Sequence, residues 1–296
     1  MPQNRRLTSW YALAVAGGLL LLAGCQRAIL PDAAPAAAPV AGVAAANPLA
    51  VDAGLEVLRR GGSAVDAAVA VQAMLGLVEP QSSGIGGGAF LLHFDAHSGR
   101  VTAFDGRETA PAAATPDLFI GADGKPLAYR DAVTSGRSTG VPGVMPMLGA
   151  AHQRHGRLPW GTLFDPAVRA AENGFTVPKR LARFVNGSWP QSTGPDVRAL
   201  FSRQDGSPVQ AGDTLRNPAY AGTLRLLAGN GPRALLMNPI AGQLIARTGA
   251  EPLPGALALD DLSAYQPGTA DPVCGPFRVY IVCVPPPPSS GVSLLQ

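Results

Sequence analysis

The sequence predicts an α+β domain, because two capped apolar helices are followed by a strand hairpin and then by further short helices and strands. Of the 296 residues 47% are hydrophobic, which is enough to bury a core in one large domain or two smaller ones. Only 15% of the residues are charged and the formal net charge is +3, too small a charge for a nucleic-acid-binding surface. We therefore expect no nucleic-acid partner.

Two helices are expected first. Asn47 and Pro48 suit the cap and the first position of a helix that ends at Gly61 and Gly62. Ser63 and Asp66 have the spacing of a capping box, which predicts a second helix over residues 64–78. Because that segment is apolar nearly all round, we expect it to be buried.

The strand hairpin comes next. Residues 89–94 are typical of a strand, and residues 100–105 of its antiparallel partner. Gly140-Val141-Pro142-Gly143 then precedes an expected helix from about Met145 to His155, and residues 162–172 are also expected to be helical.

The remaining chain is less regular. Several short helices are expected between Lys179 and Leu253. The apolar run Phe277 to Cys283 predicts one continuous strand, and a new apolar helix is expected after Ser290.

The first 25 residues have the pattern of an export signal. Arg5 and Arg6 precede an uncharged apolar run, and Leu22-Ala23-Gly24-Cys25 resembles a bacterial lipobox in which Cys25 receives a lipid. An ordinary signal peptide and a short membrane anchor are the alternatives.

We divide the chain accordingly into a signal and lipobox (1–25), an Ala/Pro-rich tether (26–45) and a folded domain (46–296). Gln26, rather than Asp, follows the cysteine, and the resemblance to Gram-negative lipoproteins implies a periplasmic protein anchored at the outer membrane.

A glycine-rich loop is the first candidate for chemistry. Gly84-x-Gly86-x-x-Ala89 matches the spacing of a dinucleotide fingerprint, but that site needs a strand before the loop and a helix after it. Here the order is helix, loop, strand, so no nucleotide cofactor is expected. The loop instead indicates a close approach of the backbone to substrate or to another strand.

The histidines do not suggest a metal site. His93 and His97 are separated by a strand end, where residues four apart do not converge. His152 and His155 lie on a predicted helix without a nearby carboxylate, and we expect them to be solvated. No metal ion is expected.

Cys274 and Cys283 are expected to be free thiols. One precedes a predicted turn and the other ends the predicted strand, which is poor geometry for a bond. A disulfide formed in an oxidising compartment is the alternative.

Arg107 is the candidate for binding a ligand. It ends the second strand between Asp105 and Glu108, where its planar guanidinium is well placed to receive a carboxylate. A surface salt bridge is the alternative.

Taken in order, the motifs resemble the gamma-glutamyltranspeptidase family over residues 45–296. The segments that carry the resemblance are Ala46–Pro48, Gly61–Ala68, Ser83–Gly88, Arg107–Pro111, Gly140–Gly143, Gly174–Val177 and Pro285–Gly291.

The resemblance implies an N-terminal-nucleophile hydrolase with a four-layered αββα core. Such a precursor, a zymogen, cleaves itself into a large and a small subunit that form a heterodimer, and no cofactor is expected. The new N-terminal Thr attacks a gamma-glutamyl amide such as glutathione, and the glutamyl group passes to water or to an acceptor. The resemblance further implies that Arg107 binds the α-carboxylate of the glutamyl group, and that Gly84–Gly88 packs near the site without contacting the ligand.

One departure from the family concerns the nucleophile, which lies in a Thr-x-His-like context. In this sequence no Thr is followed by His at either of the next two positions. We therefore expect no catalytic residue in this chain, an incomplete αββα core, and no activity from the chain alone. A large-subunit portion without its small subunit should expose apolar surface and open sheet edges.

Two other functions remain open. A cephalosporin or glutaryl acylase of the same superfamily would use Arg107 on a different acyl carboxylate. A truncated lipoprotein would only bind a partner or ligand.

Overall fold

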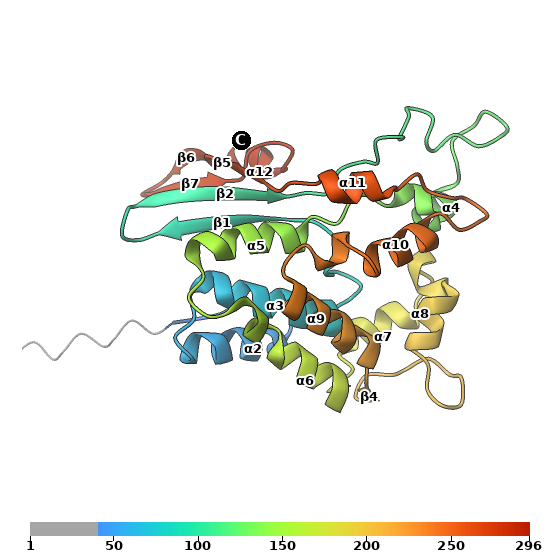
Figure 1. Ribbon diagram of the computed structural model, residues 1–296, viewed down its shortest axis with the longest axis horizontal. Coiled ribbons are helices and arrows are strands. Elements are labelled where there is room, and N and C mark those ends of the chain that lie inside the picture. Colours follow the sequence, from blue (N-terminus) through green and yellow to red (C-terminus); the bar gives the residue numbers. More distant parts are fainter. Residues whose placement is uncertain (1–40) are drawn as a thin grey trace, which may run out of the picture. The chain divides into compact units, whose positions relative to one another are not determined.

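The structure, a computed structural model, describes residues 41–296, and the folded unit spans Gly42–Gln296 (Figure 1). The predicted signal, the lipobox with Cys25 and nearly all of the tether lie outside the described residues. Within the described part of the chain, no helix combines the length and the apolar character needed to cross a membrane.

The first helix, α2 (Pro48–Arg59), begins where the sequence predicts. Asn47 Oδ1 accepts a hydrogen bond from the Leu49 amide at 3.0 Å, which caps the helix. The Nδ2 group of the same side chain donates to Glu79 Oε1 at 3.2 Å. One buried side chain therefore joins the start of α2 to the end of the next helix.

The second helix, α3 (Ala64–Val78), carries the predicted capping box. Ser63 Oγ accepts from the Asp66 amide at 3.1 Å, and the Ser63 amide donates to Asp66 Oδ2 at 2.8 Å. The helix lies at the centre of the folded unit and packs against α2, α5 and α6.

Nine further α-helices and four 3-10 helices occur within residues 41–296. The α-helices are α4 (Tyr129–Thr134), α5 (Val144–His155), α6 (Asp165–Asn173), α7 (Lys179–Val185), α8 (Pro195–Leu200), α9 (Pro218–Asn230), α10 (Ile240–Thr248), α11 (Leu259–Ala264) and α12 (Gly291–Leu295). The 3-10 helices are Gly136–Ser138, Trp160–Leu163, Pro190–Thr193 and Ala234–Leu236.

The single helix predicted over 162–172 is wrong in one respect. A 3-10 turn ends at Leu163 and α6 begins separately at Asp165. Pro166 explains the break, because proline lacks the N–H that a continuous helix would need and suits the first turn of a new helix.

Seven strands form three small antiparallel sheets in the described chain. The first sheet has the order β1 (Ala89–Asp95), β2 (Arg100–Gly106), β5 (Gly268–Ala270); the two others pair β3 (Phe175–Thr176) with β4 (Thr214–Leu215) and β6 (Val273–Phe277) with β7 (Tyr280–Val284). The β1–β2 hairpin is the one that the sequence predicts, with Leu91 opposite Phe104.

The continuous strand predicted from Phe277 to Cys283 is wrong. The chain reverses at Arg278, whose φ of 55° lies in the left-handed region, and β6 and β7 form a hairpin around it. Cys274 is thereby placed opposite Cys283, and the two form a disulfide, so the expectation of free thiols is also wrong. The turn contains neither Gly nor Asn, the residues that usually predict such a turn.

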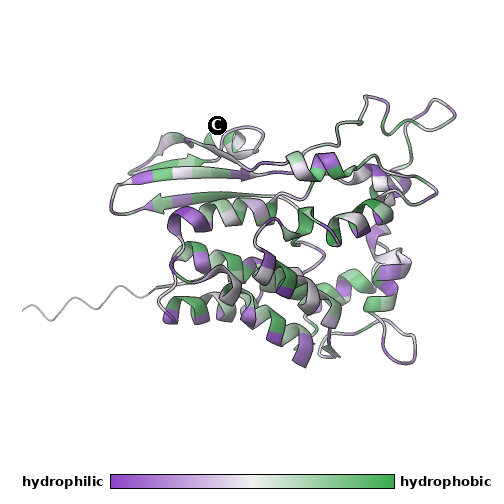
Figure 2. Cartoon of the chain, in the orientation of Figure 1, coloured by the Kyte–Doolittle hydropathy of each residue, from purple (hydrophilic) through white to green (hydrophobic). Residues whose placement is uncertain are grey.

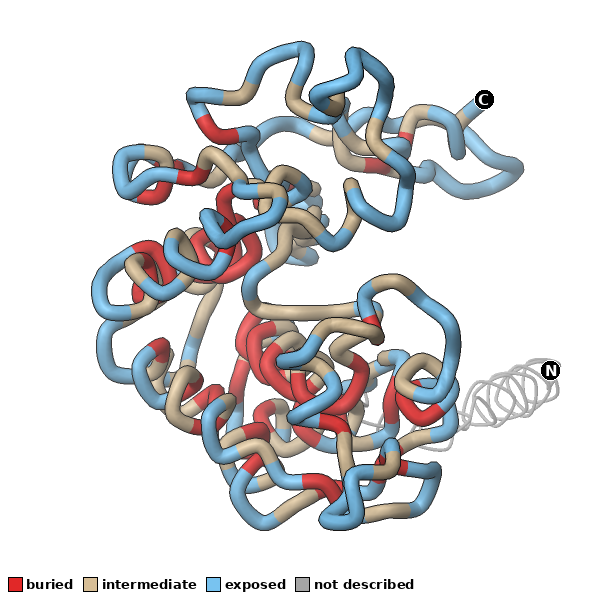
Figure 3. The backbone as a smooth tube through the Cα atoms, turned by 90° about the vertical axis from the view of Figure 1, so that its right-hand side faces the viewer, coloured by how far each residue is buried: buried red, intermediate tan, exposed pale blue. Residues whose placement is uncertain are grey.

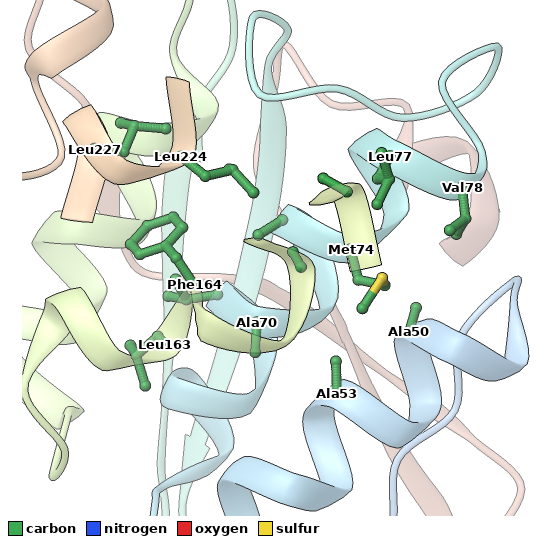
Figure 4. Close-up of a cluster of buried hydrophobic side chains, with 14 of the residues drawn as sticks. Ala50, Ala53, Ala70, Met74, Leu77, Val78, Leu163, Phe164, Leu224 and Leu227 are labelled. Atoms are coloured by element: carbon green, nitrogen blue, oxygen red, sulfur yellow. The ribbon is translucent and has the colours of Figure 1, made fainter. Parts of the chain in front are cut away.

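The core lies between the first sheet and the helices. In Figure 1, α5 runs along the β1–β2 hairpin, with α3 and α2 beyond it. Figure 4 shows small side chains of α2 and α3 packed near larger ones from Leu163, Phe164 and α9. In Figure 3 most of the buried segments, in red, lie in the interior of the folded unit. The hairpin β6–β7 is largely exposed.

Hydrophobic side chains remain exposed on the strands, as expected. On β1, Leu92 is 38% exposed and Phe94 is 62% exposed. In the hairpin β6–β7, Phe277 is 58% exposed and Ile281 is 70% exposed, and these strands can be followed in green in Figure 2. Apolar surface on this scale usually marks a contact with another polypeptide.

Candidate active site

Arg107 follows β2 directly, and its backbone is held on both sides. The Arg107 amide donates to Asp105 Oδ1 at 2.8 Å, and Tyr265 Oη donates to the Arg107 carbonyl at 2.9 Å. The side chain itself is 60% exposed. The fold therefore fixes where the guanidinium is presented and leaves it open to a ligand.

The guanidinium lines an open pocket of about 580 Å³. The pocket is lined by Gly86, Leu118, Phe119 and the two segments 107–111 and 137–140. The two segments are held together by a β-bridge directly after the second one, in which the Val141 amide donates to the Thr109 carbonyl at 2.9 Å. A pocket of this volume is large enough for a small-molecule substrate.

Two arginines and one glutamate set the charge of the pocket. Arg107 Nε lies 3.5 Å from Glu108 Oε2, and both side chains are too exposed for this ion pair to hold the guanidinium strongly. Arg137 Nη1 donates to the carbonyls of Leu118 at 3.1 Å and Ile120 at 3.4 Å, so this guanidinium supports the pocket wall. The arrangement favours an anionic ligand.

Tyr265 is a stable hydrogen-bond donor to the segment that carries Arg107. Burial, helped by the charges of Asp105 and Glu108, raises the pKa of Tyr265 to about 12. The hydroxyl therefore stays protonated at neutral pH and continues to donate to the Arg107 carbonyl.

The glycine-rich loop contributes both to packing and to the pocket. Gly87 O accepts hydrogen bonds from the amides of Gly143 and Val144, each at 3.0 Å, which fixes the start of α5. A Cβ atom on Gly88 would lie 2.6 Å from the backbone carbonyl oxygen of Gly106, which cannot move aside as a flexible side chain can, so only glycine fits there. Gly86 lines the pocket beside Arg107, so the loop lies at the edge of the site, and the expectation that it does not contact the ligand stays a prediction.

The expectation that His152 and His155 are solvated is wrong. His152 Nε2 donates to the Leu158 carbonyl at 2.9 Å and lies 3.4 Å from the buried Asp66 Oδ1. Asp66 is far from His152 in the sequence, so no nearby carboxylate was expected. His155 stacks on His93. Both environments arise because α5 packs between β1 and α3.

The part of the chain that the structure describes holds no group of three His, Cys, Asp or Glu side chains that could bind a metal ion.

Sequence reasoning missed Arg137 and Tyr265, which share the Arg107 site. Tyr265 lies 158 residues from Arg107 along the chain, so no local pattern could join them. Arg137 lies three residues before the Gly140–Gly143 motif, and this closeness to a motif of the family was the one signal that could have pointed to it.

Residues 50–296 match the family model described as Gamma-glutamyltranspeptidase. The chain belongs to the gamma-glutamyltranspeptidase family. The predicted fold class, the mixed α+β core of N-terminal-nucleophile hydrolases, is confirmed by solved relatives of this family.

Two curated relatives illustrate how much of the family this chain covers. It is 36% identical over 255 residues to the glutathione hydrolase proenzyme of Bacillus subtilis (strain 168), a match that covers 86% of this chain and 43% of the relative. It is 35% identical over 257 residues to the glutathione hydrolase proenzyme of Escherichia coli (strain K12), with the same two coverages, 86% and 43%. The chain thus spans less than half the length of these gamma-glutamyltranspeptidase relatives.

Solved structures agree with this assignment. The gamma-glutamyltranspeptidase of Helicobacter pylori is similar with a TM-score of 0.79 and 29% identity, covering 86% of this chain and 72% of that one. The cephalosporin acylase of Bacillus halodurans is similar with a TM-score of 0.69 and 28% identity, covering 87% of this chain and 49% of that one.

Proposed function

We propose that this chain binds the gamma-glutamyl donor of an enzyme that transfers a gamma-glutamyl group from glutathione, or a related amide, to water or to an acceptor amine. The observation that carries the proposal is the exposed guanidinium of Arg107, presented in a small-molecule pocket of a gamma-glutamyltranspeptidase chain. Arg107 donates two parallel N–H bonds to the α-carboxylate of the glutamyl group.

The covalent chemistry needs a hydroxyl nucleophile. The Thr oxygen attacks the carbonyl carbon of the gamma-glutamyl amide, the amine leaves with a proton, and a glutamyl ester remains on the enzyme. Water or an acceptor amine then attacks the ester carbonyl and releases the Thr. In this proposal the Thr belongs to a segment other than residues 46–296, formed by self-cleavage of a longer precursor or made separately, and the chain alone is inactive. The names of the curated relatives, which are proenzymes, support a precursor.

The second subunit also needs a surface to bind. The exposed apolar side chains on β1 and on the hairpin β6–β7, with Phe94 and Ile281 among them, are suited to this contact. We propose that they pack against the small subunit of the heterodimer.

Substitution of Arg107 in the complete enzyme tests the proposal. Arg107→Ala should weaken transition-state binding of gamma-glutamyl-p-nitroanilide by about 2–5 kcal/mol, because a charge pair is lost. Arg107→Lys should recover only part of this loss, because an ammonium cannot form the paired bonds. Arg59→Ala, on the exposed side of α2, serves as the control. Unchanged KM and kcat in Arg107→Ala would mean that Arg107 does not bind the donor.

A glutaryl or cephalosporin acylase is the second candidate, supported by the likeness to the Bacillus halodurans acylase. Both acyl groups offer a carboxylate to Arg107, so substrate comparison must separate them. Faster hydrolysis of glutaryl-p-nitroanilide than of gamma-glutamyl-p-nitroanilide would favour the acylase. Turnover of neither compound by the complete protein would favour a non-catalytic lipoprotein.

We also propose export and lipid attachment at Cys25, which would place the folded unit in the periplasm at the outer membrane. The sequence around Cys25 supports this, since it combines a basic start, an apolar run and small residues before the cysteine. Cys25→Ser should release the protein from the membrane fraction, and retention there would contradict lipid attachment.

A further inference from the structure

A second pocket, of about 590 Å³, lies between the end of α3 and the segment that contains α7 and α8. The turn Pro80–Ser82 forms one wall, α7 forms another, and Trp189, Gln191, Val197 and Phe201 complete it. It shares no lining residue with the Arg107 pocket. The proposed donor site therefore does not account for it.

Three side chains of α7 face this pocket together. Arg180, Arg183 and Phe184 are spaced three and four residues apart, which places them on one side of the helix. The helix thus presents two guanidiniums beside an aromatic ring.

One of the two guanidiniums is already compensated. Glu79 is only 2% exposed, and Arg180 Nη1 lies 3.4 Å from its Oε2 atom. Arg180 Nη2 also donates to Ser82 Oγ at 3.2 Å, so this side chain is held against the wall. Its charge balances the buried carboxylate of Glu79.

The second guanidinium is not compensated. Within residues 41–296, Arg183 forms no ion pair and no side-chain hydrogen bond, and its side chain is exposed at the pocket. The pocket therefore has one positive charge left for a ligand, which calls for a single negative charge on that ligand.

Besides the neutral polar residues Gln81, Ser82 and Gln191, the rest of the pocket lining is apolar and mostly aromatic. Trp189 is 58% exposed, an unusual exposure for an indole, while Phe201 is only 7% exposed and provides the floor together with the half-buried Phe184. The exposed indole lines the same pocket as the Arg183 guanidinium, and it offers a flat surface on which a planar apolar group can stack.

We infer that this pocket binds a small organic monoanion, a carboxylate attached to an aromatic body. The carboxylate pairs with Arg183, and the aromatic body stacks on Trp189 against Phe184 and Phe201. A volume of about 590 Å³ accommodates a ligand of this size.

Calorimetric titration of the full chain with N-acetyl-L-phenylalanine tests the inference. Binding should be saturable and should weaken at least about tenfold with N-acetyl-L-phenylalaninamide, which lacks the carboxylate, because a charge-assisted pair is worth more than 1.4 kcal/mol. Acetate, which lacks the aromatic body, should bind equally poorly. Absence of saturable binding by N-acetyl-L-phenylalanine would overturn the inference, as would equal affinity for the amide.

Variants locate the site. Arg183→Gln and Trp189→Leu should each weaken binding at least about tenfold, whereas Arg198→Gln, a matched exposed arginine on α8, should leave it unchanged. Arg107→Ala should also leave it unchanged, which separates this pocket from the donor site. Unaltered affinity in Arg183→Gln would overturn the assignment even if Trp189→Leu failed to fold.

Discussion

The imidazole rings of His93 and His155 stack with their centroids 3.8 Å apart, and so join β1 to the last turn of α5. The His155 ring also lies nearly perpendicular to the buried Phe104 ring, at 6.1 Å between centroids. Two stacked imidazoles repel each other when both are charged, so the contact favours the neutral form of His93.

This contact predicts a pH dependence of stability. Burial first, and the charge of His155 second, lower the pKa of His93 below its ordinary 6.5, against a smaller opposing effect of Asp95. The unfolded chain therefore binds more protons than the native chain as the pH falls below 6.5. The free energy of unfolding should be highest, as far as His93 is concerned, above pH 6.5 and should decrease progressively below it. Denaturant unfolding at pH 5 and pH 8 measures the effect. His93→Phe should reduce the difference, and His97→Gln, at an exposed turn, should not; an unchanged difference in His93→Phe would contradict the prediction.

Removal of the buried Asp66 carboxylate should be strongly destabilising. Asp66 Oδ2 accepts from the amides of Ser63 at 2.8 Å, Arg157 at 2.9 Å and Leu158 at 3.1 Å. Asp66→Ala leaves these donors without an acceptor and should lower the free energy of unfolding by about 3 kcal/mol, measured by urea denaturation. The exposed Asp52→Ala on α2 is the control and should change it by less than about 0.5 kcal/mol. A similar small change in both variants would show that water replaces the carboxylate.

Gly143 should not tolerate a side chain. A Cβ atom there would overlap the carbonyl of Gly106 and the hydroxyl of Tyr265, the donor to Arg107. We expect Gly143→Ala to lower the free energy of unfolding by about 2–3 kcal/mol, as overpacking does. Gly222→Ala on α9 has open space around it and should instead be stabilising by about 0.5–1 kcal/mol. Thermal or urea unfolding that ranks the two variants the other way round would refute this reading of the contact.

The Cys274–Cys283 disulfide should stabilise its own hairpin more than the helical core. The bond spans nine residues, for which closure of the loop is worth about 2–3 kcal/mol. In the double variant Cys274→Ser/Cys283→Ser, trypsin should cleave faster after Arg278 in the turn, while cleavage after the exposed Arg130 keeps its rate. Equal cleavage rates at Arg278 with and without the bond would contradict a local role.

Features set by near neighbours in the sequence were predictable. The Asn47 cap, the Ser63–Asp66 capping box and the β1–β2 hairpin all depend on residues a few positions apart. The place of Arg107 directly after a strand was predictable for the same reason, whereas its role in binding a ligand stays a prediction.

Features set by distant contacts were not predictable from local patterns. The β6–β7 turn depends on Arg278 adopting a left-handed backbone conformation without the usual glycine, and that hid both the hairpin and the disulfide. His152 lies beside Asp66, 86 positions earlier in the chain, only because α3 and α5 pack together. Tyr265 reaches Arg107 in the same way, across the fold.

The hydrogen bond from Asn47 to Glu79 also determines where a tag can be attached. Because Asn47 is buried against the end of α3, it cannot serve as a free end. Ahead of it, Val43 packs over Gly54 of α2, so residues 43–47 lie against that helix. A fusion partner or immobilising tag should therefore be joined before Gly42, where the folded unit begins, since a junction just ahead of Asn47 would remove this packing.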